Sequence, residues 1–212
     1  MRLRRTGTVV AVCLLLSSAG CTGLLLQEET AFVAGEANVT DGDGMAYAHN
    51  ATQWQNVTRS VAAAGQEREV TVSNRAVRFV DRAEDGAPGA AFVVVTSPQV
   101  RVAGQELNPV GDWSQRDLLT EFSDQFDQFG NLTGVEERET RQVRTLGTEA
   151  DMRVFNATME SEDADHDVVV SVAKVKHGED YVVAIGIRGL NGAELSTTAG
   201  DSEALVRRVE HR

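Results

Sequence analysis

The sequence predicts an α+β fold, in which an antiparallel β-sheet carries helices packed on one face. Three observations lead to this prediction. Two stretches between Gln53 and Asp81 alternate apolar and polar residues with a period of two, as β-strands do. Residues 114–129 follow the spacing of an amphipathic helix, and residues 142–187 contain Val-rich runs of strand length.

The first elements are extended. Phe32–Ala34 is expected to be a short strand, and the stretches on either side of the turn signal Ala64-Gly65-Gln66 are expected to pair as a long hairpin. Ala90–Thr96 is a continuous apolar run of strand length. Pro98 follows it, so the chain should bend there or lie at an edge.

A helix is predicted from Ser114 to Phe129. Ser114 and Asp117 have the spacing of a capping box, and Gly130 is a typical residue for ending a helix. The apolar positions, Leu118, Phe122, Phe126 and Phe129, are spaced by four, four and three residues, which places them on one face. We expect Phe122 and Phe126 to be buried against the sheet and Gln125 to lie largely elsewhere. A cofactor-binding stripe is the less favoured interpretation.

Four further strands and a helix complete the domain. The strands are expected within residues 142–145, 150–159, 168–175 and 181–187, and the helix at 202–210. This order of elements resembles the sandwich of PsbP/Mog1-like domains, and the resemblance implies that fold.

The N-terminus has the three parts of an export signal. Arg2, Arg4 and Arg5 precede the apolar run Val9–Leu16, and Ala19-Gly20-Cys21 matches a lipobox. The sequence therefore predicts a signal peptide at 1–20, a lipidated tether at 21–31 and a single domain at 32–212. A plain secretory signal followed by an incidental Cys is the alternative, and general or twin-arginine export through Arg4-Arg5 is left open.

Cysteine usage supports lipidation. Cys13 lies within the signal, so Cys21 is the only thiol of the predicted mature chain. An unpaired Cys in an exported protein needs an explanation, and a lipid anchor provides one. No intramolecular disulfide can then form.

The charge is strongly one-sided. The 212 residues include 32 acidic and 20 basic side chains, a net charge of −12. The only lysines are Lys174 and Lys176. Such a surface repels phosphates, which argues against nucleic-acid binding. Acidic excess with very little Lys is typical of proteins adapted to molar salt, where repulsion between surface charges is screened. An acidic mesophilic protein is the alternative.

Five Asn-x-Thr sequons predict N-glycosylation at an outward-facing surface. They lie at Asn38, Asn50, Asn56, Asn131 and Asn156. Unmodified turns are the alternative at any one of them.

The sequence lacks the motifs of the common catalytic and cofactor sites: it has no phosphate-binding loop, no paired-His metal helix and no nucleophile elbow. We therefore predict no catalytic residue, no metal ligand and no cofactor. The acidic stretches 41–44 and 162–167 lack the ligand spacing of an EF-hand loop.

Four segments resemble a family of haloarchaeal secreted lipoproteins known only as a domain of unknown function: Cys21–Leu24, Ser97–Val100, Asn108–Asp112 and Val175–Asp180. The resemblance implies lipidation and supplies no activity. Asn108, Pro109 and Asp112 form a candidate recognition loop. The alternative, a rigid lead-in to the helix at Ser114, is favoured.

These observations favour a non-enzymatic binding or structural module of the cell envelope, anchored by lipid to the outer face of the cytoplasmic membrane. Its expected partners are the membrane, through the anchor, and a cell-envelope protein or a small solute. The alternative is an extracellular carboxylate-dependent hydrolase or carbohydrate-active enzyme, which needs only two well-placed acids. A cleft with two facing carboxylates would favour the enzyme, and a filled sandwich without a cleft would favour the module.

Overall fold

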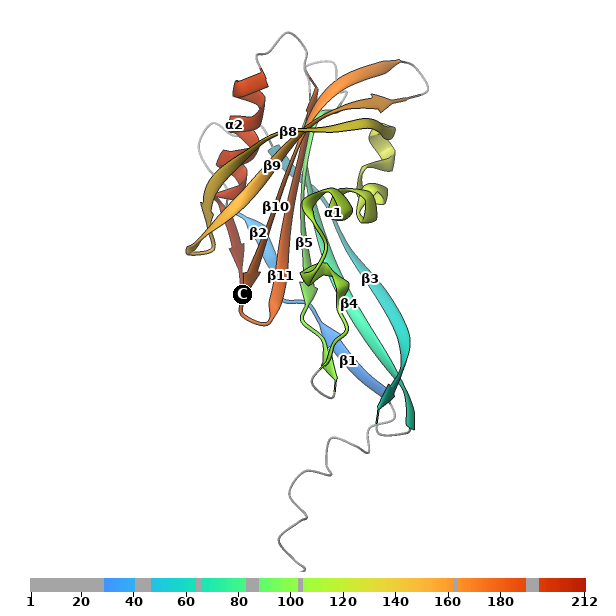
Figure 1. Ribbon diagram of the computed structural model, residues 1–212. Coiled ribbons are helices and arrows are strands. Elements are labelled where there is room, and N and C mark those ends of the chain that lie inside the picture. The colour runs from blue at the N-terminus through green and yellow to red at the C-terminus, as the bar shows by residue number, and fades with distance from the viewer. Residues whose placement is uncertain are drawn as a thin grey trace, which may run out of the picture.

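The computed structural model describes residues 29–40, 47–63, 66–82, 88–102, 105–161, 164–189 and 195–212. Its main feature is a single eight-stranded sheet (Figure 1). The strands are β1 (Glu29–Val33), β3 (Tyr47–Ala63), β4 (Gln66–Arg82), β5 (Pro88–Pro98), β8 (Asn131–Thr145), β9 (Thr148–Glu160), β10 (Asp165–His177) and β11 (Asp180–Gly189).

The strand order is β1-β4-β5-β11-β10-β9-β8, and β3 pairs with the other side of β4. Only β1 runs parallel to its neighbour, along the part of β4 that β5 does not reach. The predicted hairpin is confirmed: β3 and β4 pair from Tyr47–Asp81 to Ala63–Gln66. This hairpin extends well beyond the centre of the sheet (Figure 1).

The smaller elements lie around this sheet. Two short strand pairs are formed by β2 (Ala37–Val39) with β12 (Val209–His211), and by β6 (Arg101–Val102) with β7 (Gln105–Glu106). The helical elements are α1 (Gln115–Glu121), α2 (Leu195–Val206) and the 3-10 turns η2 (Pro109–Gly111) and η3 (Ser123–Phe129). No helix in the described part of the chain is long and apolar enough to cross a membrane.

The predicted α+β class is wrong, and with it the PsbP/Mog1-like sandwich. Among the described residues 69% are in strands and 16% are helical, so the protein is mostly β. The expectation that helices cover one face also fails, because both faces of the sheet bury side chains. Phe92 and Val94 of β5 join a cluster with Leu205 of α2, whereas Val93 and Val95 join one with Leu118 of α1. Continuous apolar runs are typical of strands buried on both faces.

The predicted helix at 114–129 is only partly correct. The capping box is confirmed: Asp117 N donates to Ser114 Oγ (3.2 Å) and Ser114 N donates to Asp117 Oδ2 (2.9 Å). Phe122 and Phe126 are buried, as expected. The α-helix, however, ends at Glu121 and a 3-10 turn follows. A 3-10 helix has three residues per turn, and in this geometry Gln125 faces inward. Gln125 is therefore buried, although it was expected to lie away from the sheet.

Two element boundaries differ from the expected ones. β1 begins at Glu29, so its first residues fall within the predicted tether, 21–31. The helix predicted at 202–210 is replaced by the end of α2 and by β12. Residues 1–28, with the predicted signal and Cys21, lie outside the described residues, as do the acidic residues 41–44.

Candidate functional site

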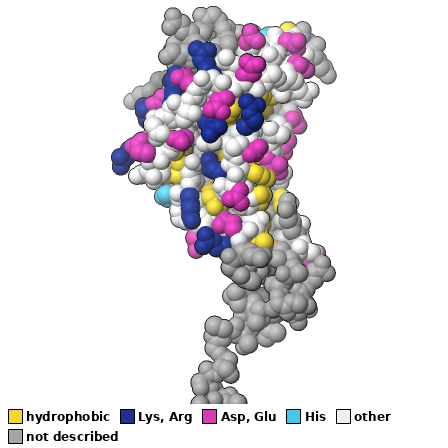
Figure 2. Space-filling view, in the orientation of Figure 1, with side chains coloured by type: hydrophobic (Ala, Val, Ile, Leu, Met, Phe, Trp, Pro, Cys, Tyr) yellow, Lys and Arg dark blue, Asp and Glu magenta, His cyan; other side chains and the backbone are white. Residues whose placement is uncertain are grey.

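A groove of about 450 Å³ lies between the β3–β4 hairpin and the segment that leads into α1. Its lining residues come from these two parts of the chain: Gln55, Val57, Ser60, Val70, Val72, Asn74, Leu107, Asn108, Pro109, Val110, Trp113, Glu121 and Phe122. Figure 2 shows hydrophobic side chains on the lower part of the face in view, with charged side chains around them. A mostly apolar cavity of this size with a few polar groups is typical of small-ligand sites.

One wall is formed by alternate residues of the hairpin. Val72 pairs with Val57 and Asn74 pairs with Gln55, so these four side chains share a face. Val70 continues the row along β4. Three of these five side chains are Val, although β3 lies at the edge of the sheet, where polar residues are usual.

The opposite wall is formed by Leu107, Pro109, Val110, Trp113 and Phe122. Trp113 and Phe122 pack edge to face, with ring centroids 6.5 Å apart. Phe122, at the end of α1, is buried and also borders the groove. The apolar core therefore forms part of the groove wall.

Asn108 fixes the start of this wall. Its Nδ2 donates to Ser97 Oγ (2.7 Å) and to the Pro98 carbonyl, and its Oδ1 accepts from Val110 N (3.0 Å). Ser97 Oγ in turn donates to Asn74 Oδ1 (2.7 Å). This chain of hydrogen bonds joins the two walls.

Lys174 attaches the same wall to the sheet. Its Nζ, on β10, donates to the carbonyl oxygens of Val110 (3.0 Å), Gly111 (2.8 Å) and Trp113 (2.6 Å). Burial lowers the pKa of Lys174, and the nearby Asp112 and Asp117 carboxylates offset this only in part. All three N–H groups of the ammonium are used, so Lys174 positions the wall rather than a ligand.

Gly111 permits the close approach of the wall to β11. A Cβ at this position would lie 2.5 Å from the Tyr181 hydroxyl oxygen, so any other residue would require the Tyr181 side chain to shift. The Tyr181 hydroxyl donates to Glu106 Oε1 (2.9 Å). Burial, followed by this hydrogen bond, raises the pKa of Tyr181.

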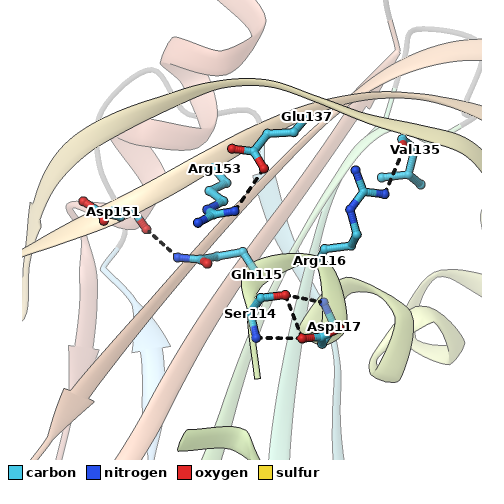
Figure 3. Close-up of polar contacts among 8 residues, drawn as sticks. All are labelled: Ser114, Gln115, Arg116, Asp117, Val135, Glu137, Asp151 and Arg153. Atoms are coloured by element: carbon cyan, nitrogen blue, oxygen red, sulfur yellow. Dashed lines mark hydrogen bonds and ion pairs between the residues drawn. The ribbon is translucent and has the colours of Figure 1, made fainter. Parts of the chain in front are cut away.

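Helix α1 is attached to β8 and β9, as Figure 3 shows. Arg116 donates to the Val135 carbonyl (2.9 Å), and its guanidinium lies 5.4 Å from the centre of the Phe155 ring. Gln115 Nε2 donates to Asp151 O (3.4 Å). Hydrogen bonds from Ser114 lower the pKa of Asp117 in the capping box. The groove wall therefore rests on a fixed helix.

A second cavity of about 330 Å³ adjoins the groove and shares Gln55, Asn74 and Phe122 with it. Its other lining residues are Gln53, Trp54, Ala76, Val95, Asp124 and Gln125. Trp54 is half exposed. Behind this cavity, Arg78 donates to the Gln125 carbonyl (2.9 Å) and to Asn50 Oδ1 (3.1 Å).

The comparison with protein families assigns the chain. It belongs to the family described as Domain of unknown function (DUF6517). The family model matches residues 36–210 and so includes both walls of the groove. No curated protein matches the chain. The resemblance to a family known only as a domain of unknown function is thus confirmed at this level.

The candidate recognition loop of this DUF6517 domain lies at the groove. Asn108 and Pro109 line it, whereas Asp112 is exposed and its backbone N–H donates to the Pro109 carbonyl (3.0 Å) at the end of η2. The loop also leads directly into α1. The position of this segment is therefore compatible with both interpretations, a recognition loop and a rigid lead-in to α1.

The five sequons lie in different surroundings. Asn38, Asn50, Asn56 and Asn131 are exposed. Asn156 is half-buried in the middle of β9, and its Oδ1 is buried without a hydrogen-bond partner. If glycans are attached, Asn156 is the least accessible acceptor.

The described residues contain no group of three or more His, Cys, Asp or Glu that could hold a metal ion. Two acids do border the cavities, Glu121 at the first and Asp124 at the second. Sequence reasoning missed the hairpin wall. The sequence signal that could have found it is Val at positions 57, 70 and 72, in strands whose residues are expected to alternate between apolar and polar.

Proposed function

We propose that the protein is a lipid-anchored binding module of the cell surface, and that its groove takes a small ligand with an apolar body. The observation that carries the proposal is the cavity of about 450 Å³, lined mainly by Val, Leu, Pro, Trp and Phe side chains, with three amides, one serine and one glutamate. Burying an apolar surface in such a cavity contributes roughly 25 cal/mol per Å².

The predicted anchor supports an apolar ligand. Cys21 lies eight residues before β1, a distance of at most about 27 Å for extended chain. β1 pairs with β4 at Val70 and Val72, which line the groove. A lipid on Cys21 would therefore keep the groove near the membrane, where apolar molecules concentrate. The acidic, Lys-poor composition supports a halophilic, archaeal source and a fold that is most stable in molar salt.

The anchor is tested by Cys21→Ser. We expect this variant to leave the membrane fraction or to accumulate as an uncleaved precursor, because the acceptor thiol is lost. Processing, mass and fractionation are compared with those of the unsubstituted protein. If all three are unchanged, Cys21 does not carry the anchor.

Ligand binding is tested with the full chain in nanodiscs in molar KCl, using N-phenyl-1-naphthylamine as an uncharged apolar probe. We expect saturable binding above the background of empty nanodiscs. Val72→Phe should abolish it by filling the groove. Thr71→Phe, which adds an aromatic ring on the opposite face of the same strand, should not. Equal effects of the two variants would contradict the proposal.

A carboxylate-dependent hydrolase is the second candidate, because Glu121 and Asp124 border adjoining cavities. Turnover of chromogenic glycosides or esters that is lost in both Glu121→Gln and Asp124→Asn would favour this enzyme over the binding module.

A further inference from the structure

The two cavities adjoin and differ in polarity. Gln55, Asn74 and Phe122 belong to both linings, so the cavities meet at these three residues. The first cavity is mainly apolar. The second is bordered by four amide side chains, of Gln53, Gln55, Asn74 and Gln125, and by one carboxylate, of Asp124.

Amide side chains are suited to hydroxyl groups. Each amide offers N–H donors and a carbonyl acceptor, and a hydroxyl group is itself both a donor and an acceptor. The Gln125 side chain is buried and its Nε2 donates to Asp124 Oδ1 (3.3 Å), which holds this amide in place within the lining. A phosphate or a carboxylate, in contrast, accepts hydrogen bonds only and leaves half of each amide unused.

The charges of the described side chains around the site disfavour an anionic ligand. Among the side chains that the structure describes, no Lys, Arg or His lines either cavity, whereas Glu121 and Asp124 do. Two described cations nearby are engaged: Lys174 with three carbonyls of the wall, and Arg78 with Asn50 and the Gln125 carbonyl. An anion placed there would exchange its hydration for amide N–H groups alone, without a described cation to pair with, and would face a like charge.

We infer that the ligand is an uncharged amphiphile of the glycolipid class, with its alkyl part in the first cavity and its hydroxyl-rich head in the second. This inference rests on the proposed function and names the ligand class of the same site. It separates glycosylated lipids from phospholipids, which would bring a phosphate to Asp124.

The chain provides one fluorescent reporter for each cavity. Its only two tryptophans are Trp113, in the lining of the first cavity, and Trp54, in the lining of the second. Trp54→Phe leaves Trp113 as the sole reporter, and Trp113→Phe leaves Trp54. Affinities are measured on the unsubstituted full chain in nanodiscs by calorimetry, and the variants show which cavity is occupied.

The probes are hexyl β-glucoside, hexanol, hexyl phosphate and hexyltrimethylammonium, all below the concentrations at which they form micelles. We expect the glucoside to change the emission of both tryptophans, hexanol that of Trp113 alone, and hexyl phosphate to bind at least tenfold more weakly than the glucoside. Equal or tighter binding of either charged probe would overturn the inference.

The outcomes separate the two proposals. If hexanol and the glucoside bind equally and Trp54 does not respond, the glycolipid inference fails while the apolar groove stands. If no probe changes Trp113, the proposed function itself fails.

Two substitutions sharpen the test. Gln55→Leu should weaken binding of the glucoside about tenfold, which corresponds to the loss of roughly one hydrogen-bonded group. It should leave the affinity for hexanol unchanged. Thr71→Leu, the control on the opposite face of the hairpin, should change neither. Asp124→Asn should raise the affinity for hexyl phosphate, and an unchanged affinity would contradict the role given to this charge.

Discussion

The two faces of the sheet are covered in different ways. On one face α2, β2 and β12 cover a closed cluster in which Phe92, Met152 and Leu205 are almost wholly buried. On the other face the cover is a seven-residue helix followed by a 3-10 turn, and the groove lies where this cover meets the β3–β4 hairpin. Apolar side chains extend beyond the region that this helix and 3-10 turn cover. A ligand can cover them there.

The closed face is also fastened at its edges. Arg75 donates to the Ala37 carbonyl (2.5 Å), which holds β2 to the hairpin. His211 Nε2 pairs with Asp180 Oδ2 (2.8 Å), which also accepts from Gly35 N (3.0 Å). His177 Nδ1 and His211 Nδ1 are 2.9 Å apart and share a hydrogen bond. These contacts tie the C-terminal strand to the sheet, so we expect this face to be structural and the groove face to bind.

The largest expected effect is that of Phe92→Ala on the closed face. Truncation of a fully buried Phe costs about 3–5 kcal/mol of unfolding free energy, through lost burial and the cavity that is left. Denaturant unfolding in molar KCl measures it. A loss below about 1 kcal/mol would mean that this face is loosely packed and that the two faces do not differ as described.

Phe122→Ala on the groove face should cost about 3 kcal/mol, the low end of the same range, because its ring already borders a cavity. It should also weaken binding of the apolar probe, which Phe92→Ala should not. Gln125→Ala is unsuitable as a neutral control, since Gln125 is buried. A Phe122→Ala variant with unchanged stability would indicate that the groove wall is not part of the core.

Lys174→Met should cost roughly 1–3 kcal/mol, because three carbonyls of the groove wall lose their donor. We expect a loosened wall and a lower probe affinity. Lys176→Met is the matched control, since Lys176 is exposed on the same strand and should change neither quantity. Equal effects of the two variants would argue against the positioning role of Lys174.

Asp117→Asn should have the smallest effect, and this effect should depend on pH. Hydrogen bonds from Ser114 lower the pKa of Asp117 in the folded state. The stability it contributes is therefore present above its ordinary pKa and is lost as the pH falls through the lowered value. Melting curves of the two proteins should differ at neutral pH and converge in acid. A difference that persists in acid would contradict this.

Local patterns predicted local structure well. The hairpin, the capping box at Ser114 and the burial of Phe122 and Phe126 follow from spacing over a few residues. Spacing did not predict that the helix ends at Glu121, because Phe residues three or four apart suit both an α-helix and a 3-10 turn. That error explains why Gln125 was expected to face outward.

The groove could not be predicted from spacing, because its walls are distant in the sequence. Val57 and Val72 meet Pro109 and Trp113 only through the pairing of the hairpin and the attachment of the loop by Lys174 and Asn108. The loop itself was identified as a candidate for recognition. The surface that it faces depends on strand order, which one sequence does not specify.

The most direct test of the central claim, that the α1 face binds and the α2 face is structural, is hydrogen–deuterium exchange with and without hexyl β-glucoside. We expect added protection to be confined to the two groove walls, residues 55–57, 70–74 and 107–113, and α2 and β12 to be unchanged. Protection centred on α2 and β12, with none at the groove walls, would contradict it.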